Sequence, residues 1–173
     1  MAPTVSFWDT GEFIATSHIL GVPHPPGSPL FLLVGKFFSL IPISSDIAFR
    51  VNIFSPIISA LTISLLFLIC NQFIDRMDPS DNNKFFKMWS SLTASLTFAF
   101  THSHWFNAVE TEVYAFSGFM TALVVFLIMR WSQKIHDSNH IIYLIFISYI
   151  IGLATGLHLL NLLTIPFIGL IIY

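Results

Sequence analysis

The fold is decided by residues 51–74, VNIFSPIISALTISLLFLICNQFI, a run that contains no Asp, Glu, Lys or Arg. A helix of this length rises about 1.5 Å per residue and crosses the roughly 30 Å hydrocarbon core of a bilayer. Residues 88–104 and 113–129 are two further runs of helical length without those four residue types. We therefore expect an all-α fold, a polytopic transmembrane helical bundle.

Two other apolar segments complete this bundle. Residues 141–173 are too long for one simple crossing, and the Gly, His, Asn and Pro residues of "GLATGLHLLNLLTIP" mark a helix end or kink. We expect a span over 141–157 and the start of a further helix over 159–173. Residues 29–41 are apolar but short and lie between two prolines, which favours an interfacial helix.

The composition excludes several classes of protein. Hydrophobic residues make up 55% of the chain and charged residues 9%, and the mean hydropathy is +0.79, which is typical of a protein in a bilayer. The net charge of -2 argues against nucleic-acid binding, and the single Cys70 excludes an internal disulfide framework. No signal peptide is visible. We expect the 173 residues to be an N-terminal part of one larger transmembrane domain.

The basic residues predict the orientation in the membrane. Five of the seven Lys and Arg residues lie in the 75–88 and 130–140 loops, whereas residues 1–28 and 101–112 contain none. The positive-inside rule places the first two segments in the cytoplasm and the last two outside. Lys36 and Arg50 are exceptions, because this topology puts both near the outer face.

Three polar clusters then converge on the outer face. Counting about 1.5 Å per residue from His140 places His158 about 27 Å along its span, near the external loops. The other titratable residues of the clusters come from residues 1–28 and 101–112. They are Asp9, Glu12, His18, His24, His102, His104, Glu110 and Glu112.

Several of these residues also have structural interpretations. Asp9-x-x-Glu12 has the form of a capping box, in which Glu12 reaches back to the Asp9 amide. The prolines around His24 fit a rigid connector. His102 and His104 share one side only in an extended segment, where a metal pair with Glu110 or Glu112 is conceivable but disfavoured. Carboxylates at the start of a span are costly unless they face protein or water.

Three motifs in order resemble a known family. They are "FWDTGEFIATSHILGVPHPPGSPLF", "AVETEVYAFS" and "GLATGLHLLNLLTIP". Together they resemble proteins of the transmembrane-protein-260 type, which are protein O-mannosyltransferase-like enzymes of the GT-C glycosyltransferase class. The amino-acid sequences of the three motifs are most similar to those of bacterial members from the Bacteroidetes group. The resemblance covers essentially the whole chain.

The resemblance implies a membrane enzyme that transfers a sugar, mannose by analogy, from a polyprenyl-phosphate carrier to a hydroxyl on the external face. It also implies an essential acid in the first external loop, at Asp9 or Glu12. We favour Asp9 because it follows Phe7 and Trp8, where a sugar ring can stack and partial desolvation raises a carboxylate pKa. The candidate donor-binding residues are His24, Arg50, His102, His104, Glu110, Glu112 and His158.

The remaining expectations concern partners and location. The partners are membrane lipids, the polyprenyl-phosphate sugar and an acceptor protein or glycan. No cofactor is assigned, and a divalent metal is disfavoured. The location is a bacterial inner membrane with a periplasmic active face, or the endoplasmic reticulum membrane in a eukaryote. The alternatives are a transporter or channel component, in which His158 and Asn161 form a relay, and a non-catalytic scaffold.

Overall fold

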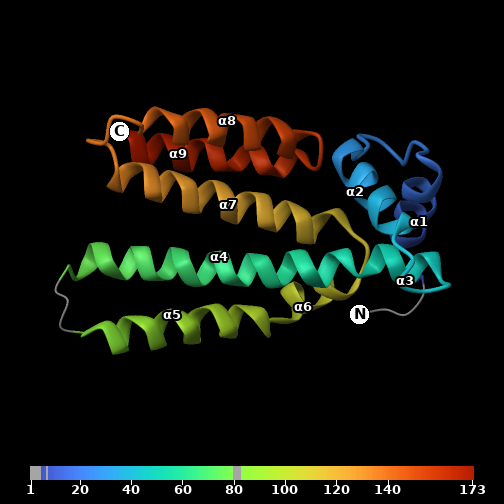
Figure 1. Cartoon of the computed structure of the whole chain (residues 1–173), viewed down its shortest axis with the longest axis horizontal. Coiled ribbons are helices and arrows are strands. Elements are labelled where there is room, and N and C mark those ends of the chain that lie inside the picture. Colours follow the sequence, from blue (N-terminus) through green and yellow to red (C-terminus); the bar gives the residue numbers. More distant parts are fainter. Residues whose placement is uncertain (1–4, 7, 80–82) are drawn as a thin grey trace.

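The computed structural model describes residues 5–6, 8–79 and 83–173, and this part of the chain is helical, without a strand (Figure 1). Phe7, on which part of the argument for Asp9 rests, lies outside the described residues, as do residues 80–82 of the predicted cytoplasmic loop. The all-α prediction is confirmed.

Helix α4 (Phe54–Met77) forms the long axis of the bundle. It continues from the short α3 (Ile47–Asn52), and α5 (Lys84–Ala99) and α7 (Val113–Gln133) lie along opposite sides of it. Among the described residues, two stretches are long and apolar enough to cross a membrane, Ile47–Met77 and Val113–Gln133. The predicted runs 51–74 and 113–129 fall inside them.

The other helices occupy the flank and one end of this core. Helices α8 (Ile141–Thr155) and α9 (Thr164–Ile172) pair beside α7 and are joined through the 3₁₀ helix η2 (Leu159–Leu163). Helices α1 (Thr10–Ile19) and α2 (Pro29–Leu40) gather where α4 begins. A helix is therefore present where residues 29–41 predict one, and it ends one residue earlier than expected.

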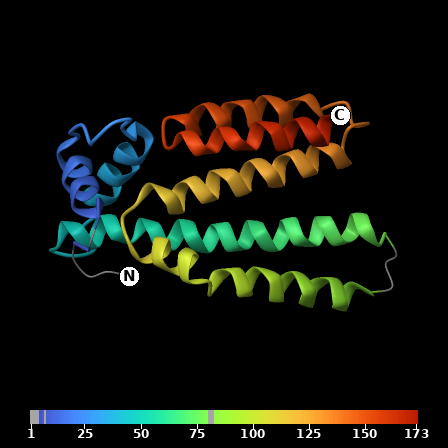
Figure 2. The ribbon, with the colours of Figure 1, turned by 180° about the vertical axis from the view of Figure 1, so that it is seen from behind.

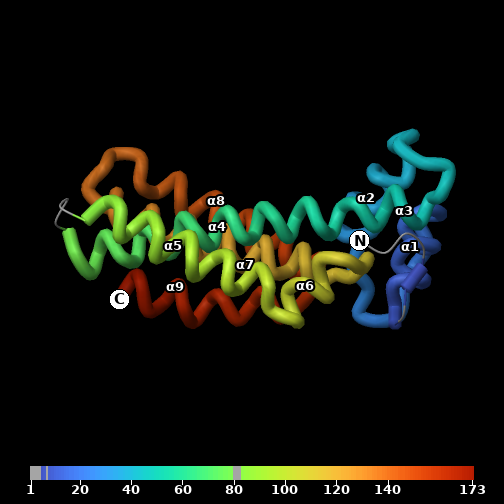
Figure 3. The backbone as a smooth tube through the Cα atoms, turned by 90° about the horizontal axis from the view of Figure 1, so that it is seen from below, coloured from blue at the N-terminus to red at the C-terminus, as the bar shows by residue number. Residues whose placement is uncertain are grey.

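The two ends of the bundle contain different connections and helices. The connections α4–α5 and α7–α8 lie at one end, whereas α1, α2, α6 and the turn between α8 and η2 lie at the other (Figure 2). Viewed from below, α4, α5 and α7 follow the long axis and α1 to α3 project at the opposite end from those connections (Figure 3). This separation fits the grouping that the basic residues predict.

The single span predicted over 88–104 is wrong. Helix α5 ends at Ala99, and a separate helix, α6, covers His102–Val109. Thr101 between them is extended, with φ -66° and ψ 144°, and its hydroxyl donates to the Phe98 carbonyl. This bond satisfies a carbonyl at the end of α5. The chain can therefore turn within the apolar run, before residue 104.

The break between α8 and η2 receives the start of α2. The Ser28 hydroxyl donates to the Leu157 carbonyl at 3.0 Å, and the Leu30 amide donates to the Gly156 carbonyl at 3.2 Å. Carbonyls at a helix end need such partners, because the helix itself no longer supplies amides. The first loop is therefore fixed to a turn about 130 residues later in the chain.

The two exceptional basic residues, Lys36 and Arg50, bind backbone carbonyls. Arg50 donates from Nε to the Ser44 carbonyl at 2.5 Å and from Nη1 to the Ser39 carbonyl at 3.1 Å. Lys36 donates to the His18 carbonyl at 2.5 Å. Both therefore secure the ends of α1 and α2, where a cation also interacts favourably with the helix dipole.

Candidate functional site

Helix α1 is held against the bundle by a series of aromatic contacts. Phe13 packs edge-on against Phe31 of α2, with ring centroids 5.2 Å apart. Phe31 contacts Phe54 of α4 at 6.2 Å, and Phe54 contacts Phe116 of α7 at 5.1 Å. Edge-to-face rings at these distances attract each other and resist sliding. The contacts fix the start of α1 relative to the start of α7.

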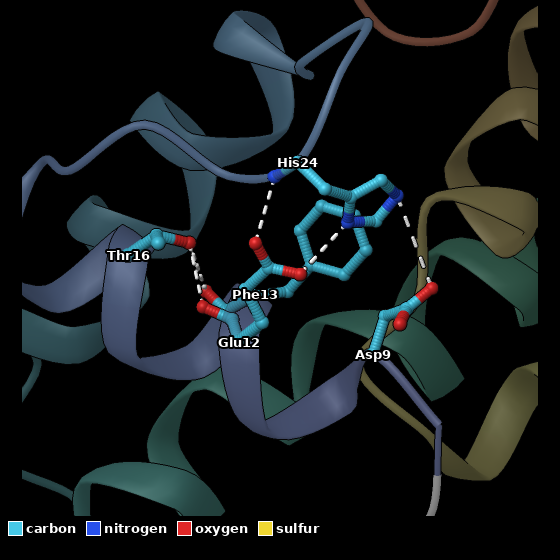
Figure 4. A network of polar contacts seen from close by, with 5 residues as sticks. All are labelled: Asp9, Glu12, Phe13, Thr16 and His24. Atoms are coloured by element: carbon cyan, nitrogen blue, oxygen red, sulfur yellow. Dashed lines mark hydrogen bonds and ion pairs between the residues drawn. The ribbon is translucent and has the colours of Figure 1, made fainter.

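Glu12 and His24 form a clamp that closes the first loop (Figure 4). One Glu12 oxygen accepts the His24 backbone N–H at 2.7 Å, and the other lies 2.7 Å from the ring Nδ1. These bonds lower the pKa of Glu12, and the Glu12 carboxylate raises the pKa of His24. Both shifts favour the charged forms, a carboxylate bonded to an imidazolium, and both oxygens of Glu12 are in use.

The turn that brings His24 onto α1 depends on Gly27. The Gly27 amide donates to the His24 carbonyl at 2.9 Å, and Gly27 has a φ of +79°. Glycine tolerates this left-handed backbone region at little cost. The proline-rich segment is thus a connector that also positions an imidazole, so the two interpretations of His24 are compatible.

Asp9 is free of a capping role. It is the N-cap residue of α1, but its side chain makes no capping hydrogen bond. Its carboxylate lies 4.0 Å from His24 Nε2 and is half exposed. The capping-box interpretation is wrong, because Glu12 bonds to His24 instead of returning to the Asp9 amide.

Glu110 and Glu112 flank an anchored residue in the extended segment before α7. The Thr111 hydroxyl donates to the Asn52 side chain, and both residues are fully buried. Glu110 and Glu112 are themselves only 5% and 6% exposed. The bond to α3 therefore fixes two buried carboxylates beside the start of α1.

Glu112 has an unusual charge environment. Burial, followed by the negative charges of Asp9 and Glu110, raises the pKa of Glu112 to about 7. The Asp9 amide opposes this shift by donating a hydrogen bond to the Glu112 carboxylate. Glu112 therefore keeps its proton to a higher pH than an ordinary glutamate and can exchange it near neutral pH.

Asp9, Glu110 and Glu112 line a common pocket with a volume of about 210 Å³, which we call the acidic pocket. Aromatic and amide side chains complete its wall. The described residues that line it are Trp8, Asp9, Phe106, Asn107, Glu110, Glu112 and Tyr114. No Lys or Arg is among these residues, so the pocket favours neutral or cationic groups.

The histidines of α6 are divided between two neighbouring pockets. His102 lines an open pocket of about 450 Å³, together with Trp8 and Asn107. His104 lines a larger pocket of about 500 Å³ between α4, α5 and α7, and partial burial lowers the pKa of His104. Because α6 is helical, the extended segment needed for a His102–His104 metal pair is absent, and that alternative is wrong.

His158 reaches the same end of the bundle, as its position along the span predicts. Its ring lies 5.6 Å from that of Tyr114, which lines the acidic pocket. Its Nδ1 accepts the Leu160 amide at 3.3 Å and caps η2. The structure thus brings His158 close to the site, but Arg50 makes its side-chain hydrogen bonds to the ends of α2 and the following loop.

One group within the described residues has the geometry of a metal site. Asp9, Glu12 and His24 each offer a ligand atom within 4.8 Å of the other two. A metal ion would need a neutral imidazole and a released Glu12 oxygen. The raised pKa of His24 and its short bond to Glu12 oppose both requirements.

The sequence did not point to Phe106, Asn107 or Tyr114 as site residues. All three line the acidic pocket. Asn107 reaches it because α6 turns away from α5 after Thr101. The apolar run over 88–104 contains no proline or glycine that signals this turn.

Comparisons with known proteins agree on one family. The family described as "Protein O-mannosyl-transferase TMEM260 N-terminal domain" matches residues 9–173. The chain is 30% identical to "Protein O-mannosyl-transferase tmem260" of Dictyostelium discoideum, over 95% of this chain and 20% of that protein. It is 31% identical to "Protein O-mannosyl-transferase TMEM260" of Mus musculus, over 72% of this chain and 16% of that protein.

No solved structure matches the chain significantly. The alignments span about a fifth or less of the length of these two relatives. The matched family region begins at Asp9 and includes all the predicted site residues. The apolar helices and the relatives together identify a membrane protein.

Proposed function

Since this chain belongs to the TMEM260 family of protein O-mannosyl-transferases, we propose that its intact protein transfers mannose from a polyprenyl-phosphate carrier to a protein hydroxyl at the external face. One observation carries the proposal. The half-exposed Asp9 carboxylate lines a pocket that adjoins a long apolar groove in the helix bundle.

The groove supports a donor with a long hydrocarbon chain. Asn107 and Tyr114 line the acidic pocket, the His102 pocket and the 500 Å³ pocket, so the three are neighbours. Ile69 and Val125 are shared between the 500 Å³ pocket and a further pocket of about 600 Å³ that lies further along α4, toward Arg76. A sugar phosphate at the outer end with its chain along the bundle fits this sequence of pockets.

The proposed reaction needs one proton acceptor. The acceptor hydroxyl oxygen forms a bond to the anomeric carbon while the bond from that carbon to the phosphate oxygen breaks. The electron pair leaves with the phosphate, and the hydroxyl proton passes to a carboxylate. Asp9 suits this step better than Glu12, because both Glu12 oxygens are bonded to His24.

The leaving phosphate needs positive charge or hydrogen-bond donors. The candidates for these groups are His24, whose pKa the Glu12 carboxylate raises, and the His102 ring in the neighbouring pocket. A transporter with a relay through Asn161 is disfavoured. The amide nitrogen of Asn161 donates to the Ala154 and His158 carbonyls, and its oxygen accepts from Ser117 and Thr121.

The test is transfer by the full-length protein in nanodiscs, with polyprenyl-phosphate mannose and a peptide containing Ser and Thr. A mass increase of one hexose on the peptide supports the proposal. If neither mannosyl nor other hexosyl polyprenyl phosphates give a product, the proposal is overturned.

We expect transfer to survive EDTA with less than a twofold loss of rate. The Glu12 and Asp9 carboxylates favour the protonated form of His24, which offsets part of their negative charge without a metal ion. Initial rates are compared after dialysis against EDTA and after adding back Mn²⁺ or Mg²⁺. A large loss that either ion restores would contradict this prediction.

We expect the connection 134–140 and the segment 101–112 to lie on opposite sides of the membrane. Single cysteines at Ser138 and Ser103, both exposed, are placed in a Cys70→Ser background. An impermeant maleimide added to sealed, right-side-out vesicles should label the Ser103 position and leave the Ser138 position unlabelled until the vesicles are opened. Labelling of both positions before opening would refute the topology.

A further inference from the structure

The acidic pocket has the shape of a site for a small ligand. Its volume of about 210 Å³ is below the range of about 300–1,000 Å³ that is typical of sites for drug-sized molecules. Three carboxylates and one amide face it together with three aromatic rings. Its occupant should therefore be compact, rich in hydrogen-bond donors and apolar on one face.

Glu110 lines this pocket and has a carboxylate oxygen without a hydrogen-bond donor in the described part of the chain. The residue is 5% exposed, and its Oε2 has no hydrogen-bond partner among the described residues. A buried polar atom without a partner is costly and is rare in folded proteins. That Glu110 oxygen is enclosed by protein, so a ligand hydroxyl in the acidic pocket would satisfy it after a rotation of the Glu110 side chain.

Trp8 supplies an apolar wall that is open to solvent. Its side chain is 83% exposed, yet it lines both the acidic pocket and the His102 pocket. Its φ of +62° is uncommon for a residue other than glycine and is costly for a bulky side chain. A strained, exposed tryptophan beside two other rings is well placed to cover the apolar face of a ligand.

The charge of the pocket excludes the phosphate as its occupant. Asp9, Glu110 and Glu112 surround it without a Lys or Arg, and like charges at short range repel. The adjoining His102 pocket contains no carboxylate. A neutral polyol in the acidic pocket, with its phosphate toward His102, satisfies both sets of residues.

We propose that the acidic pocket binds the hexose ring that is transferred, with Trp8 stacked on its C–H face and Glu110 accepting hydrogen bonds from its hydroxyls. This inference rests on the proposed function and adds the subsite that recognises the sugar. Trp8 and Glu110 are then specificity residues, and Asp9 lies at the same pocket as the bond that breaks.

Two variants of the full-length protein test the subsite, Trp8→Ala and Glu110→Gln, with Trp8→Phe as the conservative replacement. Trp105→Ala is the matched control, because Trp105 is also exposed, at 56%, but does not line the acidic pocket. We expect the KM for polyprenyl-phosphate mannose to rise at least tenfold in both test variants. Trp8→Phe should recover most of the loss, and the control should stay within twofold of wild type.

A binding measurement separates this inference from the proposed function. Saturation-transfer NMR with methyl α-mannoside should show ring protons near the wild-type protein, and Trp8→Ala should abolish the signal. Retention of that signal in both Trp8→Ala and Glu110→Gln, or its absence in wild type, overturns the subsite. A protein that binds the mannoside through Trp8 but transfers no sugar refutes only the proposed function.

Discussion

Replacing Asp9 with asparagine is expected to lower the rate of mannose transfer about 10²- to 10⁴-fold, which is the usual effect of losing a general base. The amide keeps the shape of the carboxylate but cannot accept a proton. The Asp9 side chain makes no capping bond, so helix α1 loses nothing. The variant should therefore insert, fold and bind the donor like the wild type.

Asp46→Asn is the matched control for this experiment. Asp46 is the N-cap of α3, and its carboxylate accepts the Ala48 amide at 2.8 Å. Asparagine caps a helix about as well as aspartate, so this variant should transfer at the wild-type rate. Single-turnover rates are measured for both. If Asp9→Asn keeps its rate within a few-fold of wild type, the proton acceptor is another carboxylate.

Replacing Gly35 with alanine is expected to destabilise the protein by about 1–3 kcal/mol, the usual cost of overpacking. A Cβ at Gly35 would lie 2.8 Å from the Ser17 Cβ, closer than real Cβ atoms approach. Ser17 is fully buried on α1 and cannot turn away. Helix α1 must shift from α2 and displace Asp9 and Glu12, so transfer should fall as well.

Gly152→Ala is the control for Gly35→Ala, because a Cβ at Gly152 meets no atom of the described chain within 4 Å. Thermal unfolding in detergent is followed for both variants. Gly35→Ala should melt several degrees lower, whereas Gly152→Ala should change little. Adding Ser17→Gly to Gly35→Ala should restore transfer in part. An unchanged melting temperature and transfer rate in Gly35→Ala would contradict the packing argument.

The helices of the membrane core were predictable because their signal is local. The run 51–74 corresponds to α4, and the run 113–129 corresponds to α7, with shifts of a few residues at the ends. Length and hydropathy decide such helices before any packing occurs. The observed helix ends differ from the predicted ones because the capping contacts depend on neighbouring side chains.

The details of the site depend on contacts between distant residues, which a single sequence does not reveal. The capping-box pattern predicted that Glu12 bonds to the nearby Asp9 amide. In the structure, the proline-rich turn places His24, twelve residues later, against the Glu12 carboxylate. Arg50 has the charge expected of a phosphate ligand, yet nearby carbonyls of residues 39 and 44 bind it. In both cases the position of the side chain depends on a hydrogen-bond partner that the local sequence does not identify.

The bonds from Ser28 and Leu30 to the turn after α8 impose an order on biosynthesis. Chains emerge from the ribosome with the N-terminus first. The Gly156 and Leu157 carbonyls are made long after Asp9, Glu12 and His24 have left the ribosome. The first loop therefore lacks its final anchor while α4 to α8 are synthesised, and the nascent protein acquires a complete site only as α8 joins the bundle.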